Sequence, residues 1–244
     1  MRLIVDLEPA DPPFGLALDE AVFDVAREGG QGCVRLWVNH RAVIVGRSQR
    51  LESEVDLGRA RREGFLVLRR ISGGGTVVHY PGNLNVSVIT AARTVGSVEM
   101  TFARIGGAVA RGISALSAPV EASGNRLIAS GRKVGGAAQA RRGGAVLYHT
   151  TVLVAPADLP LDSLLLAHRA EYRPVGVRSR AEATTTLSEI LARSISLVEA
   201  SKAAIGGLAA VFDLEESVLE PQETSRAQRL ALEKYGRTEW NASR

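Results

Sequence analysis

The order of the apolar segments constrains the fold of this 244-residue chain more than any other feature. Short runs typical of strands dominate the middle of the chain, whereas helical patterns fill the last third. Because the two kinds of segment are segregated, the sequence predicts an α+β domain with a mixed or antiparallel sheet. The expected strands are residues 2–5, 34–38, 42–45, 65–69, 76–80, 84–90, 126–129, 132–139 and 145–154. The expected helices are residues 15–27, 54–62, 98–116, 161–168, 186–192, 197–212 and 223–235, and a hairpin turn is expected at 39–41.

The composition excludes several classes of protein. Apolar residues make up 45% of the chain, but no run approaches the roughly 18 residues that span a membrane. Asp6 and Glu8 interrupt the start, which is unlike a secretory signal. The single cysteine, Cys33, excludes a disulfide framework and a cysteine-cluster metal site, and it fits a reducing cytoplasm. We expect one cytoplasmic domain over residues 1–244 that spans no membrane.

The basic residues do not indicate a nucleic-acid partner. The net charge is +4, and only three of the 30 basic residues are lysines. The arginines are scattered among carboxylates, and aromatic residues are only 5% of the chain.

The segment 69–83, RRISGGGTVVHYPGN, carries the first candidate site. Three consecutive glycines between two expected strands let backbone N–H groups approach a ligand closely. Arg70 enters this loop and His79 leaves it, and the pattern matches neither a dinucleotide fingerprint nor a Walker loop. The local alternative is a flexible hairpin with a solvated Arg70 and a hydrogen-bonded His79.

Two further segments contain candidate polar residues. In 130–139, SGRKVGGAAQ, Lys133 is surrounded by small residues, so its ammonium can lie against a bound anion. The alternative is a surface lysine on an edge strand. In 147–153, LYHTTVL, His149 lies inside an apolar strand, where a core histidine is the alternative. The four histidines lack metal-site spacing, no GxSxG is present, and Cys33 is expected to be a buried structural thiol.

Together these segments resemble the lipoate–protein ligase A family. Its RRxSGGGxVxH signature and following Gly-Asn pair appear as residues 69–79 and 82–83, and its GxKxxGxA segment begins with residues 131–137. Residues 173–180 look like the family's adenylate-binding loop, and residues 234–241 match the family's Tyr…Glu-Trp-Asn ending.

The resemblance implies a class II aminoacyl-tRNA-synthetase-like domain, shared with biotin ligases, whose mixed and largely antiparallel sheet is flanked by helices. It implies that lipoate and ATP, with Mg²⁺ accompanying the ATP, form lipoyl-adenylate and pyrophosphate. The acyl group then passes to the ε-amine of a lysine on a lipoyl-domain acceptor.

The resemblance also implies roles for individual residues. Lys133 would be the catalytic residue, a protonated group that contacts the lipoate carboxylate and the α-phosphate. Val77, Val86 and Ala137 are expected from strand alternation to line an apolar acyl tunnel. No metal ligand is identified. The expected substrate- and adenylate-binding residues are Arg70, Ser72, Gly73, Gly74, Gly75, Thr76, Val77, Val78, His79, Asn83, Ala137 and His149.

Three features depart from the family pattern. Arg126 stands where the family usually has an aspartate, which questions an acidic, metal-facing role there. Thr150 replaces a glycine, so close backbone approach at this position is not assured. The chain ends soon after the Glu-Trp-Asn segment, so we expect a separate accessory subunit in place of a C-terminal domain.

Other functions stay open at this point. A lipoyl or octanoyl transferase would need an active-site cysteine, and Cys33 lies far in sequence from the lysine motif. A biotin ligase is disfavoured because its GRGRxGR loop is replaced by RRISGGG. A non-catalytic subunit that binds lipoyl-adenylate is a third possibility. The sequence does not distinguish lipoate from octanoate, or one acceptor from another.

Overall fold

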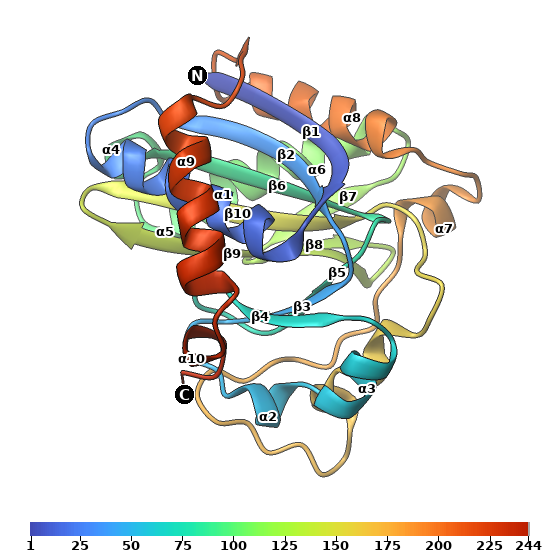
Figure 1. The fold of residues 1–244 in the computed structure, drawn as a ribbon. Helices are drawn as coiled ribbons and strands as arrows, with labels where there is room; N and C mark the ends of the chain where they lie inside the picture. Colours follow the sequence, from blue (N-terminus) through green and yellow to red (C-terminus); the bar gives the residue numbers. More distant parts are fainter. Residues whose placement is uncertain (244) are drawn as a thin grey trace.

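Two β-sheets organise the computed structural model, which describes residues 1–243 (Figure 1). The large sheet is mixed, because β1 is parallel to its two neighbours and the other pairs are antiparallel. Its strand order is β11 (Glu215–Glu216), β1 (Arg2–Ala10), β2 (Cys33–Asn39), β6 (Asn83–Ala91), β10 (Ala145–Leu153), β9 (Arg132–Arg142), β8 (Arg126–Ala129) and β7 (Val120–Ser123). The small sheet has the order β4 (Leu66–Arg69), β3 (Ala42–Val45) and β5 (Val77–His79).

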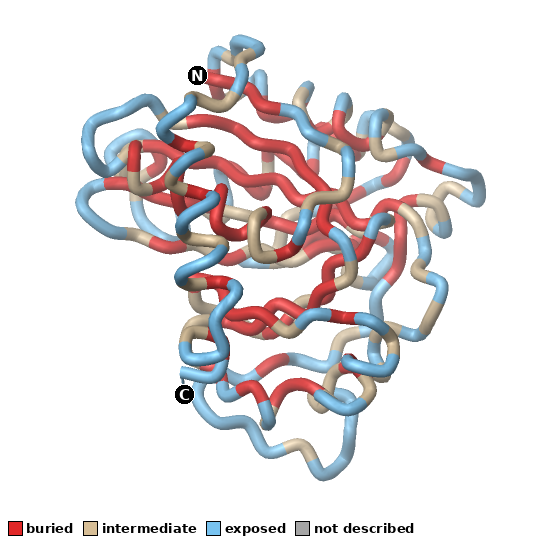
Figure 2. The backbone as a smooth tube through the Cα atoms, viewed as in Figure 1, coloured by how far each residue is buried: buried red, intermediate tan, exposed pale blue. Residues whose placement is uncertain are grey.

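Helices cover both faces of the large sheet. On one face, α1 (Pro12–Arg27) and α9 (Pro221–Leu230) pack together with the wide turn η4 (Ala231–Tyr235). On the other face, α6 (Gly107–Ser114) and α8 (Leu197–Ala209) enclose a core of β6 and β10 side chains. The central strands are therefore buried along most of their length, as Figure 2 shows. This arrangement confirms the predicted α+β class with a mixed, largely antiparallel sheet.

None of the helices of residues 1–243 is long and apolar enough to cross a membrane.

Shorter elements join the layers of the fold. The shorter elements are α2 (Leu51–Glu54), α3 (Leu57–Arg62), α4 (Ala92–Val95), α5 (Val98–Thr101), η1 (Phe102–Gly106), η2 (Leu161–Leu164), η3 (Leu166–His168), α7 (Leu187–Leu191) and α10 (Thr238–Asn241).

The predicted hairpin at residues 39–41 is wrong. The strands on either side do not pair, because β2 lies between β1 and β6 whereas β3 lies between β4 and β5. Every residue of β2 is buried, so this strand needs a neighbour on each edge and a layer on each face. The three residues therefore carry the chain from one sheet to the other.

Three predicted helices are interrupted. The helix expected at 161–168 is replaced by the two short 3₁₀ turns η2 and η3. The helix expected at 54–62 is split, and Asp56 begins its second part by accepting a hydrogen bond from the backbone of Arg59. The helix expected at 98–116 contains the wide turn η1 between α5 and α6. Strand β7 and helix α10 are each four residues long and were not predicted.

Candidate active site

A cavity of about 230 Å³ lies between the two sheets. Strands β2, β6, β8, β9 and β10 of the large sheet and β3 and β5 of the small sheet contribute to its wall, and residues 177–182 cover it. The lining residues are Leu16, Trp37, Ile44, Arg70, Gly74, Gly75, Thr76, Val77, His79, Asn85, Asn125, Arg126, Lys133, Gly136, Ala137, Ala138, His149, Thr150, Thr151, Val177, Arg178, Ser179, Arg180 and Glu182.

Arg70 fixes the shape of the glycine loop. Its guanidinium is buried, and it donates to the carbonyl oxygens of Ile44, Gly73 and Gly75 and to the hydroxyl of Ser72. Four of its five N–H groups thus bind the protein itself. Burial lowers the pKa of Arg70 to about 10, so the side chain stays charged at neutral pH. Arg70 therefore holds the glycine loop in its folded shape.

Glycine is required where the loop meets β3. Gly74 has a φ of +88°, which a side chain rarely tolerates. A Cβ atom on Gly46 would lie 2.0 Å from the carbonyl oxygen of Gly74, so the two backbones touch directly. This contact keeps the glycine loop flat against the end of β3.

Two neutral histidines line the inner part of the cavity. Asn39 donates to Nδ1 of His79 at 3.2 Å, which leaves Nε2 of His79 as the protonated nitrogen. Arg70 donates to Ser72, whose hydroxyl can therefore donate to Nε2 of His149 at 2.6 Å. Burial, reinforced by the charge of Arg70, lowers the pKa of each histidine to about 3. Both rings are uncharged at neutral pH.

Lys133 extends from β9 to the mouth of the cavity. Its Nζ lies 3.4 Å from Oε2 of Glu182, and Nη1 of Arg126 donates to the other oxygen of that carboxylate at 2.8 Å. Partial burial opposes ionisation of Glu182, but these two cations hold its pKa below the usual value. The position at which the family pattern has an aspartate thus carries an arginine here, and the nearby carboxylate comes from Glu182.

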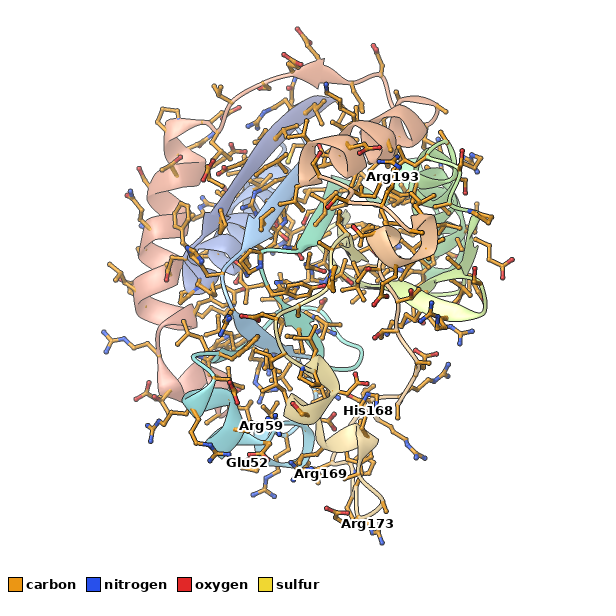
Figure 3. All side chains as sticks on the ribbon, turned by 90° about the vertical axis from the view of Figure 1, so that its right-hand side faces the viewer. Glu52, Arg59, His168, Arg169, Arg173 and Arg193 are labelled. Carbon is orange, nitrogen blue, oxygen red and sulfur yellow. The ribbon has the colours of Figure 1, made fainter. Side chains whose placement is uncertain are left out.

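Residues 177–182 are held over the glycine loop by Ser179. Its hydroxyl accepts from the backbone N–H of Thr76 at 3.0 Å and donates to Oε2 of Glu54 at 2.5 Å. At the outer end of the same connection, Arg173 is exposed and points into solvent, below His168 and Arg169 (Figure 3). Only the second half of the predicted adenylate-binding loop therefore reaches the cavity.

The structure brings most of the predicted site residues together. The cavity is lined by Arg70, Gly74, Gly75, Thr76, Val77, His79, Lys133, Ala137 and His149. Four others do not line it: Ser72 bonds to His149, Gly73 accepts from Arg70, Val78 packs in the core of the small sheet, and Asn83 donates to Asn85.

The predicted acyl tunnel needs one correction. Val77 and Ala137 line the cavity, but Val86 is fully buried between β6 and the helices on the opposite face. Alternation along β6 sends its neighbour Asn85 to the cavity instead. The polar residues Asn83, Asn85 and Ser87 at every second position of this strand are the sequence signal for this orientation. Trp37 and Glu182 carry no local signal.

The cavity does not offer a protein site for Mg²⁺. No group of three or more histidine, cysteine or carboxylate side chains among residues 1–243 could hold a metal ion. Glu182 is the one carboxylate in the described lining, and it is already paired with two cations.

A helix-flanked mixed sheet with a glycine loop and a lysine in the lining of one cavity is the arrangement of ligases with the class II aminoacyl-tRNA-synthetase-like fold. The sequence model of the lipoyl protein ligase A/B catalytic domain matches residues 11–209. The chain belongs to this family.

Proteins of similar sequence include lipoate ligases and an octanoyltransferase. Lipoate-protein ligase A subunit 1 of Thermoplasma acidophilum is 30% identical over 98% of this chain and 95% of its own length. An octanoyltransferase of Symbiobacterium thermophilum is 31% identical over 94% of this chain and 93% of its own length.

Solved structures share the fold at comparable identity. A T. acidophilum lipoate protein ligase with bound lipoic acid superposes with a TM-score of 0.84 and 28% identity, covering 100% of this chain and 98% of the other. A lipoate-protein ligase A bound with ATP gives 0.82 and 29%, covering 99% and 98%. The T. acidophilum bi-partite ligase, described with its E2 lipoyl domain, gives 0.83 and 26%, covering 99% and 95%.

Proposed function

We propose that this chain activates lipoate with ATP to form lipoyl-AMP and transfers the lipoyl group to a lysine of a lipoyl-domain protein. The observation that carries the proposal is the position of Lys133. Its ammonium stands at the mouth of a cavity that is also lined by the glycine loop, two neutral histidines, apolar side chains and further charged and polar groups. Such a cavity fits an apolar acyl chain inside and two anions at the mouth.

In the first step, a carboxylate oxygen of lipoate attacks the α-phosphorus of ATP. The bond to the bridging oxygen breaks, and pyrophosphate leaves. Lys133, with Arg178 and Arg180 nearby in the lining, offsets the negative charge that accumulates as the two anions meet. The glycine loop brings backbone N–H groups to the phosphate without side chains in the way.

In the second step, the ε-amine of an acceptor lysine attacks the acyl carbon of lipoyl-AMP. The new C–N bond replaces the C–O bond, AMP leaves, and the amine loses a proton. The relatives support the choice of partners, since the T. acidophilum ligase is bi-partite and was described with an E2 lipoyl domain. We propose that this chain likewise acts with a separate accessory subunit on a lipoyl domain, in the cytoplasm.

The octanoyltransferase relative makes acyl transfer without ATP the alternative. That reaction proceeds through a thiolate in the transferases of this superfamily. Burial, reinforced by the Asp19 carboxylate, raises the pKa of the Cys33 thiol to about 12, and Cys33 does not line the cavity. No other cysteine occurs in the chain, which favours the ligase.

Exchange of labelled pyrophosphate into ATP tests the first step directly. The proposal predicts exchange that requires lipoate and Mg²⁺ and that is strongest when the accessory subunit is added. Binding of lipoyl-AMP in the absence of any pyrophosphate exchange would instead identify a non-catalytic binding subunit.

A further inference from the structure

Two cations at the cavity mouth share one carboxylate. Glu182 receives a hydrogen bond from Arg126 at 2.8 Å on one oxygen and lies 3.4 Å from Nζ of Lys133 on the other. The side chains of Arg126, Lys133 and Glu182 are 33%, 24% and 20% exposed, so all three are partly withdrawn from water. They come from β8, β9 and the connection that follows residue 180, and all three line the cavity.

The backbone ties Glu182 to Lys133. The N–H of Lys133 donates to the carbonyl of Ala183, and the N–H of Thr185 donates to the carbonyl of Lys133, both at 2.9 Å. The two segments form a short parallel bridge at this point. Because the bridge fixes the backbone of Lys133 against the residues that directly follow Glu182, the two side chains start from backbones with a fixed relative position.

The sheet register completes the arrangement. An irregularity between Leu127 and Ile128 pairs Arg126 with Gly136 and Ile128 with Lys133. The Lys133 side chain lies over Gly136, where an added Cβ would come within 3.0 Å of Cε and 3.2 Å of Nζ. The absence of a side chain at 136 therefore lets Lys133 reach the same carboxylate as Arg126.

We propose that Glu182 is a positioning residue that anchors the Lys133 ammonium at the cavity mouth. The proposal rests on the function proposed above, in which Lys133 acts on the substrate anions. An ammonium has three N–H donors, so one can face Glu182 while two remain for the lipoate carboxylate and the α-phosphate. Arg126 holds the carboxylate more tightly than Lys133 does, which keeps Glu182 in place when Lys133 turns to its substrates.

The first test measures the contact without any need for activity. The chain has lysines only at 133, 202 and 234, so acetylation of each with a limiting amine reagent can be followed by peptide mass spectrometry. In Glu182→Gln, acetylation of Lys133 should become at least about threefold faster, because its counter-ion is gone. Lys202 and Lys234 should not change; Lys234 is bound to Glu20 and reports whether the fold is intact.

The matched control is Glu199→Gln, which removes a carboxylate from a surface pair with Arg193 remote from the cavity. It should leave acetylation of all three lysines unchanged. Equal acetylation of Lys133 in the wild type and in Glu182→Gln overturns the proposal.

The second test separates positioning from substrate binding. In lipoate-dependent pyrophosphate exchange, Glu182→Gln should lower kcat about tenfold, which is the loss expected for one hydrogen bond to a charged group. The KM for lipoate should change less than about twofold, and Glu182→Asp should recover part of kcat. An unchanged kcat overturns the proposal even if acetylation changes. If the wild type shows no exchange, the proposed function fails, whereas the acetylation rates still decide whether Glu182 anchors Lys133.

Discussion

Replacing Lys133 by glutamine should abolish most of the adenylation activity and leave the fold intact. Glutamine keeps a polar side chain but removes the positive charge that faces the substrate anions. At about 4 Å and an effective dielectric constant of about 20, a unit charge interacts with a developing charge by roughly 4 kcal/mol. The arginines at the mouth compensate for part of this, so we expect a loss of about 3 kcal/mol, or about 10²-fold in kcat.

The assay is lipoate-dependent pyrophosphate exchange, measured together with the melting temperature. The Lys133 side chain is 24% exposed and its contact with Glu182 is long, so Tm should change by no more than a few degrees. A variant that keeps more than about a third of the wild-type kcat, at unchanged Tm, would refute the role assigned to this ammonium.

Three other predictions concern the surroundings of the cavity. Lowering the pH from 6.5 towards 3 should destabilise the protein, because His79 has a folded pKa of about 3 and the unfolded chain takes up the proton first. At pH 5, His79 should account for a loss of about 2 kcal/mol in the free energy of unfolding. Urea unfolding of His79→Gln should show a smaller loss on acidification than the wild type, and an identical dependence of the unfolding free energy on pH would contradict this. Asn241→Ala should cost about 2–3 kcal/mol in urea unfolding, because the amide accepts from the backbone of buried Arg69 and donates to two carbonyls; a cost below 0.5 kcal/mol would contradict it. Cys33→Ala should leave pyrophosphate exchange within about twofold of the wild type, whereas loss of acyl transfer in that variant would favour a thioester mechanism.

Local chemistry in the sequence was enough to locate the glycine loop and Lys133. Both lie within short segments of small residues, which allow the backbone or the ammonium to approach a ligand closely. The strand and helix classes also followed from periodicity, since most buried strands are continuous apolar runs.

The remaining site residues come together only through the tertiary structure. Trp37 and Asn85 meet because β2 pairs with β6, a contact between segments about 50 residues apart. Glu182 reaches Lys133 because the segment that follows it forms an isolated parallel bridge with Lys133 at Thr184. Neither pairing has a signature in the local sequence. The expected hairpin at 39–41 is wrong for the same reason, because the choice of partner strand depends on how the whole strand is buried.

The hydrogen bonds of Arg70 could not be read from the sequence motif. The sequence placed it at the site, and the structure places it against the cavity. Its donors, however, bind the carbonyls of the glycine loop. The number of N–H groups left for a ligand depends on the folded loop and is not visible in the motif.

The most direct test of the account is the intact mass of a lipoyl-domain acceptor after incubation with this chain, the accessory subunit, lipoate and ATP. The proposed reaction adds one lipoyl group to one lysine, it requires ATP, and Lys133→Gln should prevent it. Modification from an octanoyl-carrier donor in the absence of ATP, with no product from lipoate and ATP, would contradict it.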